Sequence, residues 1–253
     1  MLAPLALGCI WAGGIAFDVL LGLIAIGLAY EWLGLCRRRG APLDVLLFAA
    51  VPLSVAVAAW GFAGYAVMLL ALATVAGAIG AGGFSPVRPV AFGIPYLGLG
   101  GVALVWLRQP PGSGAINVMV LLLVVWASDI GAYIAGRAIG GPRLAPAISP
   151  GKTWSGAVGG LAAAAAVGAA APAILGHAPS LWHPALLAIV IGVVGQAGDL
   201  FESLVKRHFG VKDSGSIIPG HGGLLDRLDA VLTAAPAAAL LALALGGGVV
   251  LWE

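Results

Sequence analysis

The chain of 253 residues is 61% hydrophobic and only 9% charged, and ordinary soluble domains carry roughly 25% charged residues, so a water-soluble fold is excluded. Its net charge of +2 comes from 12 basic and 10 acidic residues that form no contiguous basic surface, which excludes nucleic acid as a partner. A helix needs about 20 apolar residues to cross a bilayer, so the length leaves no room for a separate soluble domain. We predict an all-α integral membrane protein, a polytopic bundle of about eight or nine transmembrane helices.

Apolar runs interrupted by glycine, proline and charge predict the spans in chain order. They cover residues 2–16, 19–36, 43–60, 64–80, 90–107, 116–136, 154–175, 184–205 and 230–252. The first run is near the minimum length and is followed by Asp18, so eight spans of unchanged orientation remain if it does not form. We divide the single membrane domain into N-terminal transmembrane helices, 1–115, and a C-terminal catalytic region, 116–253.

The basic residues predict the orientation, because Lys and Arg concentrate in cytoplasmic loops. With Arg37, Arg38 and Arg39 inside, 11 of the 12 bases lie at or near that face, and only Arg108 lies outside. The loops 137–153 and 206–229 are therefore expected in the cytoplasm, with the C-terminus on the external side.

The first polar site in the catalytic region is an i, i+4 pair within an apolar run. Asp129 and Tyr133 stand four residues apart in WASDIGAYIAG, so they share one face of a helix. Their spacing fits equally a hydrogen bond between packed helices and a pair of site residues, and the sequence leaves both interpretations open.

The second site is the loop from Ser149 to Thr153, which reads SPGKT. Its GKT resembles a phosphate-binding loop, but Pro146 stands where that motif requires glycine. Lys152 and Thr153 nevertheless precede a helix predicted to begin near Trp154, and a helix N-terminus attracts anions. An ordinary helix cap explains the same residues, so this alternative stays open.

The most polar segment is DLFESLVKRHFGVKDSGSIIPGHGGLLDRLD, residues 199–229, with five of the ten acids and four of the twelve bases. One helical face is expected to carry Asp199, Glu202, Ser203, Lys206 and Arg207. At 1.5 Å rise per residue, Asp199 lies about 10 Å deeper than Lys206. Because a charge at that depth costs at least ~2.5 to 3.5 kcal/mol, the stripe indicates a functional path or pocket.

A second carboxylate face follows the glycine-rich breaker 215–223. Asp226 and Asp229 stand at i, i+3 at the start of the last helix, at the same membrane level as the first face. Mg²⁺ takes one or two carboxylates together with substrate phosphates, so we predict Asp199, Asp226 and Asp229 as metal ligands. Neighbouring bases would hold the phosphates. In the alternative interpretation these charges form ion pairs that tie the loop to the helix.

This segment resembles the signature of the phosphatidate cytidylyltransferase (CDP-diacylglycerol synthase) family. The matching residues are Ser203, Lys206, Arg207, Lys212, Asp213, Gly215, Pro219, His221, Gly222, Gly223, Asp226, Arg227 and Asp229. Upstream, WASDIGAYIAGRAIG and SPGKTWSG resemble the family's Asp/Tyr/Gly motif and its SPxKTxEG segment. The resemblance covers roughly residues 120–235, and Ser155 departs from it, since the family often has Glu or Gln there.

The resemblance implies that a phosphate of phosphatidic acid attacks the α-phosphorus of CTP, giving CDP-diacylglycerol and pyrophosphate, with Mg²⁺ required and a second cation as a further option. The predicted catalytic residues are Asp199, Asp226, Lys206, Arg207, Lys212 and Asp213. The predicted substrate-binding residues are Ser149, Lys152, Thr153, Ser203, His221, Gly222, Gly223, Arg227, Asp129 and Tyr133. We expect a multi-pass enzyme of the inner (cytoplasmic) cell membrane whose site faces the cytoplasm, and a homodimer is compatible with the sequence.

Two other functions remain to be weighed. An ion-coupled transporter would relay cations through Asp129, Asp199 and Asp226, but it predicts charge in both halves of the membrane, whereas here the charge gathers near the cytoplasmic side. A related CTP-dependent lipid transferase or kinase would keep the signature and change the lipid acceptor. No residue in the sequence indicates which acyl chains the enzyme prefers.

Overall fold

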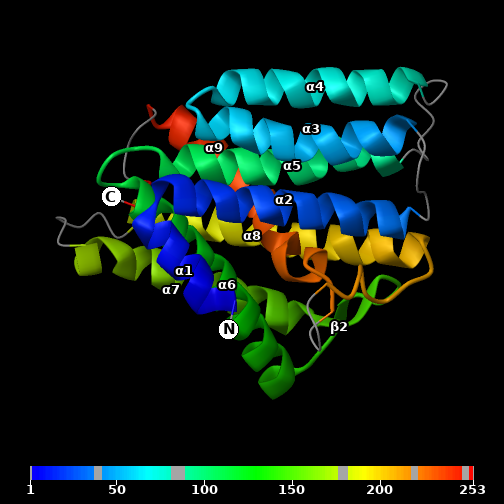
Figure 1. The fold of residues 1–253 in the computed structure, drawn as a ribbon. Helices are drawn as coiled ribbons and strands as arrows, with labels where there is room; N and C mark the ends of the chain where they lie inside the picture. The colour runs from blue at the N-terminus through cyan, green and yellow to red at the C-terminus, as the bar shows by residue number, and fades with distance from the viewer. Residues whose placement is uncertain are drawn as a thin grey trace. The chain divides into compact units, whose positions relative to one another are not determined.

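The computed structural model describes residues 2–36, 42–80, 89–175, 182–217, 222–246 and 251–252. Within these ranges the chain folds into α-helices and one short hairpin (Figure 1). The elements are α1 Leu2–Ala12, α2 Gly14–Leu35, α3 Pro42–Ala59, α4 Ala63–Gly80, α5 Pro89–Arg108, α6 Gly114–Ile139, β1 Arg143–Ala145, β2 Ser149–Thr153, α7 Trp154–Leu175, α8 Trp182–His208 and α9 Leu225–Ala244. The hairpin corrects the all-α prediction in one loop.

The helix lengths identify a polytopic helical membrane protein. Among the described residues, six helices are long and apolar enough to cross a membrane: α2, α5, α6, α7, α8 and α9. The apolar segments Asp44–Ala59 in α3 and Ala63–Ile79 in α4 are shorter.

The predicted first span, 2–16, is wrong. α1 has only 11 residues, so it is about 16 Å long and cannot cross a core of ~30 Å. The chain breaks at Gly13, whose φ of 65° is in the region that favours glycine. Arg108 stabilises the chain next to this break, because its Nε donates a hydrogen bond to the carbonyl of Ile10 at 2.7 Å. Residues 14–16 begin α2 instead.

The predicted last span, 230–252, is also wrong in its bounds. α9 begins at Leu225, before the first apolar stretch, and ends at Ala244. Gly246, with φ of 110°, follows its end. Beyond it, the backbone N–H of Leu251 donates to Oδ1 of Asn117 at 3.0 Å, which ties the chain end to α6. Asp226 thus lies in the first turn of a helix, as the sequence predicted.

The residues group into two compact units. The N-terminal unit comprises Met1–Gln109 with His208–Leu228, and the C-terminal unit comprises Pro110–Arg207 with Asp229–Glu253. The segment His208–Leu228 therefore packs with the N-terminal helices, although it belongs in sequence to the predicted catalytic region. The division after residue 115 stays a prediction.

In the N-terminal unit, α2, α3, α4 and α5 run side by side (Figure 1), with α3 packed against each of the other three. The interior is mostly apolar, and its largest buried side chain is the indole of Trp32, which packs on the ring of Tyr96 at a centroid distance of 5.4 Å. Gly93 allows this packing, since a Cβ there would lie 2.3 Å from the indole nitrogen.

In the C-terminal unit, α6 lies along α7 at close range because glycines face each other. A Cβ on Gly159 would stand 2.2 Å from the Cβ of Ala135, so the two backbones need that glycine. Gln196 of α8 joins both helices: its Nε2 lies 3.1 Å from Oγ of Ser128 and 3.1 Å from the carbonyl of Ala157. These contacts fix the three helices that carry the candidate site.

Candidate active site

The hairpin delivers a lysine and a threonine to the start of α7. β1 and β2 pair in antiparallel fashion, and α7 begins at Trp154, as predicted. The Thr153 hydroxyl accepts a hydrogen bond from the backbone N–H of Gly156 at 3.1 Å, which satisfies one of the free donors at the helix N-terminus. Thr153 is therefore a helix cap, the alternative that the sequence left open, and Lys152 precedes it.

A cavity of about 560 Å³ lies within the C-terminal unit, a volume typical of small-molecule sites. Its lining comes from α6, the hairpin, α7 and α8. The lining residues are Asp129, Ala132, Tyr133, Gly136, Arg137, Arg143, Leu144, Gly151, Lys152, Thr153, Gly156, Ala157, Gln196 and Asp199. The structure thus brings together Asp129, Tyr133, Lys152, Thr153 and Asp199, five residues that the sequence predicted for the site.

An ion pair at this cavity joins β2 to α8. Nζ of Lys152 lies 2.5 Å from Oδ2 of Asp199, and both side chains are about 30% exposed. On α6, Arg137 donates to the hydroxyl of Tyr133 at 2.7 Å. The cavity therefore offers a carboxylate, an ammonium and a guanidinium to a ligand within one unit.

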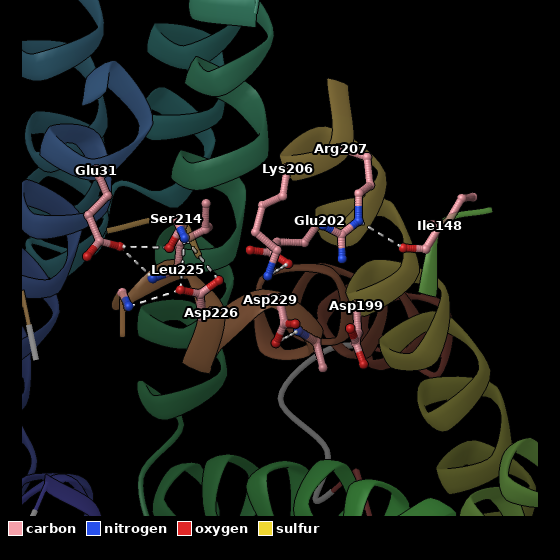
Figure 2. Close-up of polar contacts among 12 residues, drawn as sticks. Glu31, Ile148, Asp199, Glu202, Lys206, Arg207, Ser214, Leu225, Asp226 and Asp229 are labelled. Carbon is pink, nitrogen blue, oxygen red and sulfur yellow. Dashed lines mark hydrogen bonds and ion pairs between the residues drawn. The ribbon is translucent and has the colours of Figure 1, made fainter. Parts of the chain in front are cut away.

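Four carboxylates of this unit interact electrostatically. The carboxylate of Asp229 interacts with those of Asp199, Glu202 and Asp129, and Asp129 in turn interacts with Asp199 and Lys152. Figure 2 shows Asp199, Glu202 and Asp229 near one another. Like charges within membrane helices are unfavourable unless a proton, a basic side chain or a cation neutralises them, so these carboxylates form the most acidic part of the unit's described residues.

Lys206 takes part in a buried ion pair. Its Nζ lies 2.7 Å from Oε2 of Glu202, whose side chain is 1% exposed (Figure 2). The next residue, Arg207, is exposed and donates from Nε to the carbonyl of Ile148 in the hairpin turn at 3.4 Å. Both bases, predicted to hold phosphates, therefore have protein partners, which fits the alternative of structural ion pairs for Lys206.

Asp226, in the N-terminal unit, organises the loop that precedes α9. Its Oδ2 accepts hydrogen bonds from the backbone N–H groups of Ser214 and Gly223, each at 2.9 Å. A Cβ on Gly223 would stand 2.1 Å from Oγ of Ser214, so close packing of the loop, rather than access for a ligand, explains this glycine. The Asp226 carboxylate therefore joins Ser214 and Gly223, which lie on the two sides of this loop.

The other predicted residues are more scattered. Ser149, Ser203 and Gly222 are half-buried, whereas Lys212, Asp213 and Arg227 are exposed. His221 lies outside the described residues, as do the bases Arg37–39 and Arg88 that supported the predicted orientation. Asp199 and Asp226 belong to different units, so a metal ion shared by them stays a prediction.

Sequence reasoning missed Glu31 and Gln196. Glu31 in α2 is 2% exposed and accepts hydrogen bonds from the backbone N–H groups of Leu224 and Leu225, at 2.9 and 2.8 Å. Gln196 lines the cavity and joins three helices. Each is a polar side chain inside an apolar span, a signal that marks functional positions in membrane proteins.

Comparisons with known proteins identify the relatives of this chain. A sequence model of the Cytidylyltransferase family matches residues 1–245. A protein of Brucella suis biovar 1 named phosphatidate cytidylyltransferase is 41% identical over 93% of this chain and 87% of its own length. A protein of the same name from Brucella abortus biovar 1 has the same identity and coverage. Another, from Staphylococcus saprophyticus, is 43% identical over 56% of this chain and 54% of its own.

Proposed function

The chain belongs to the cytidylyltransferase family, and we propose that it transfers CMP from CTP to phosphatidic acid, giving CDP-diacylglycerol and pyrophosphate for phospholipid biosynthesis. The observation that carries this proposal is the 41% identity, over 93% of the chain, to relatives named phosphatidate cytidylyltransferase. The cavity with Lys152 and Asp199 supports it, because an ammonium that can neutralise a phosphate and a carboxylate that can bind a cation meet there inside a membrane protein.

The reaction needs positioning and charge neutralisation more than proton transfer. A phosphate oxygen of phosphatidic acid forms a bond to the α-phosphorus of CTP, and the bond from that phosphorus to the pyrophosphate oxygen breaks. Because the nucleophile is already anionic, the protein's main task is to hold phosphates in line and to offset their charge. Lys152 and Arg137, both at the cavity, are suited to that task.

The residues present also fit Mg²⁺. Among the described residues, no group of three or more His, Cys, Asp or Glu side chains could hold a metal ion. Mg²⁺ does not need one, since it takes one or two carboxylates together with substrate phosphates and water. We propose Asp199 and Asp229 as metal ligands within the C-terminal unit and Asp226 as a metal ligand within the N-terminal unit, and the two positions leave scope for a second cation. When bound, Mg²⁺ would neutralise charge on the phosphate oxygens.

The assay that tests the function uses purified enzyme in detergent with CTP, Mg²⁺ and phosphatidic acid. We expect a lipid-linked CMP product and an equal amount of pyrophosphate. Parallel reactions with an ether-lipid phosphate and with a polyprenol distinguish the alternative acceptors. Release of CDP with a phosphorylated lipid would identify a kinase, and failure of every lipid acceptor to react would contradict the proposal.

Light scattering on the same sample measures the mass of the particle and so tests whether the enzyme is a homodimer.

We further propose a multi-pass enzyme of the inner membrane with eight spans, α2 to α9, and with the hairpin and the loop before α9 in the cytoplasm. This arrangement places the end of α5, with Arg108, on the external side. A cytoplasmic site at the membrane rim would bring a water-soluble nucleotide to a lipid acceptor.

Cysteine labelling tests this orientation. Ser214 is buried and bonded to the Asp226 carboxylate, but Ser216 is exposed in the same loop. In a background without Cys9 and Cys36, neither of which forms a disulfide, Ser216→Cys should react with a membrane-impermeant thiol reagent only from the cytoplasmic side. Pro111→Cys, exposed in the turn between α5 and α6, should react only from outside. The opposite pattern would reverse the topology.

A further inference from the structure

Glu31 is a buried carboxylate of α2 that contacts the loop preceding α9. Its side chain is 2% exposed, and its oxygens accept hydrogen bonds from the backbone N–H of Leu224 at 2.9 Å and of Leu225 at 2.8 Å. The Ser214 hydroxyl donates to Oε2 at 3.4 Å. The Glu31 side chain, near the end of α2, therefore bonds to residues on both sides of this loop: Ser214 on one side, and Leu224 and Leu225 on the other.

The two backbone donors are those that begin α9. The first N–H groups of a helix have no partner within the helix, and the positive end of the helix dipole favours a negative charge there. Glu31 therefore caps α9 from a different helix. The capped turn carries Asp226, which is the second residue of α9.

The packing around Glu31 is tight. A Cβ on Gly215 would stand 2.6 Å from Oε1 of Glu31, so the loop approaches the carboxylate closely only because it has glycine there. One turn earlier on the same face of α2, a Cβ on Gly27 would lie 2.9 Å from Cδ2 of Leu224. Positions 27 and 31 therefore form the part of the α2 surface against which the loop packs.

Ser214 connects Glu31 to Asp226. Its hydroxyl donates to Glu31, and its backbone N–H donates to Asp226, so Ser214 lies between the two carboxylates (Figure 2). Gly223 donates to Asp226 from the other end of the loop at 2.9 Å. A displacement of the loop away from Glu31 would therefore turn or release the Asp226 carboxylate.

We propose that Glu31 is a positioning residue for cytidylyl transfer: by capping α9 and holding Ser214, it fixes the orientation of Asp226. The inference rests on the function proposed above, in which Asp226 is a metal ligand. Glu31 itself touches no substrate in this proposal. A catalytic carboxylate that is misplaced by a fraction of an ångström loses transition-state contacts more than ground-state binding.

The test compares Glu31→Gln with a matched control in the same unit, Gln109→Ala. Gln109 donates to the carbonyl of Ala58 at 2.6 Å, so its removal also deletes a bond between side chain and backbone, but not one to the loop. Two quantities are measured on each protein in detergent: hydrogen exchange of the amides of Leu224 and Leu225, and kcat and KM for CTP and phosphatidic acid.

In Glu31→Gln we expect exchange at these amides to rise about tenfold or more, because an amide group replaces one acceptor and the charge is lost. We expect kcat to fall about tenfold or more, with each KM within about threefold of the parent value. Glu31→Asp should recover part of both. The control should match the parent protein in both quantities.

Unchanged exchange in Glu31→Gln would overturn the cap, and faster exchange with normal kcat would overturn the positioning role. A rise in KM alone would also overturn it. If the parent protein makes no CDP-diacylglycerol, the proposed function fails and the positioning role with it. The exchange measurement then still decides separately whether Glu31 holds the loop.

Discussion

Replacing Asp199 with asparagine is expected to lower kcat by about 100-fold or more, the usual loss when a group that stabilises transition-state charge is removed. Asp199 lines the cavity and pairs with Lys152 at 2.5 Å, and it belongs to the carboxylate cluster around Asp229. The substitution keeps the shape of the side chain and removes its negative charge. Since both side chains of the pair are about 30% exposed, the variant should remain folded, with a small change in melting temperature.

Two further variants decide what the carboxylate does. Asp18→Asn changes another aspartate in a membrane helix, outside the cavity, and should leave turnover unchanged. The double variant Lys152→Met with Asp199→Asn removes both charges of the ion pair. Lys152→Met alone is measured beside it, because Lys152 is itself proposed to hold a phosphate. If Asp199 served only to neutralise Lys152, the double variant would lose no more activity than Lys152→Met; a clearly larger loss in the double variant, measured as kcat on folded protein, supports a direct role for Asp199.

The long apolar segments could be predicted from sequence because their hydrophobic runs and breakers are local. α7 was predicted as 154–175 and occupies Trp154–Leu175. The break at Gly13 was missed because apolar residues continue on both sides of it, so only the backbone conformation marks the end of α1. The hairpin was missed for another reason: strands of three and five residues are defined by their pairing and leave almost no periodic pattern.

Much of the candidate site could also be predicted, since intramembrane charges are rare and therefore conspicuous. Asp129, Lys152 and Asp199 come from three separate elements, and the structure places all three at one cavity. The sequence did not indicate which partner each charge takes. Glu31 shows the limit most clearly: its bonded partner Leu224 is 193 residues away, and no local pattern predicts a contact at that separation.

Lys206→Ala is expected to destabilise the protein strongly. Lys206 neutralises Glu202, whose side chain is 1% exposed, at a distance of 2.7 Å. Removing one partner of a buried ion pair costs about 3 to 5 kcal/mol, because the remaining charge stays buried. For a chain of this size that corresponds to a fall of roughly 6 to 20 °C in melting temperature in detergent.

Lys212→Ala is the matched control, since Lys212 is an exposed base of the same polar segment. An exposed substitution changes stability by about 0.5 kcal/mol or less, so its melting temperature should stay near that of the parent protein. If Lys212 holds a substrate phosphate, its loss appears instead as a higher KM or a lower kcat.

The double variant Glu202→Gln with Lys206→Met separates the two roles of Lys206. Removing both charges of a buried pair is often close to neutral, so the double variant should regain most of the melting temperature lost in Lys206→Ala. Its kinetics then report on the phosphate role without the structural deficit, and Glu202→Gln alone shows how much the loss of that carboxylate contributes. Normal kinetics in the double variant would show that Lys206 serves the fold through Glu202. A melting temperature unchanged in Lys206→Ala, with a raised KM for CTP, would contradict the structural assignment and restore the phosphate role predicted from the sequence.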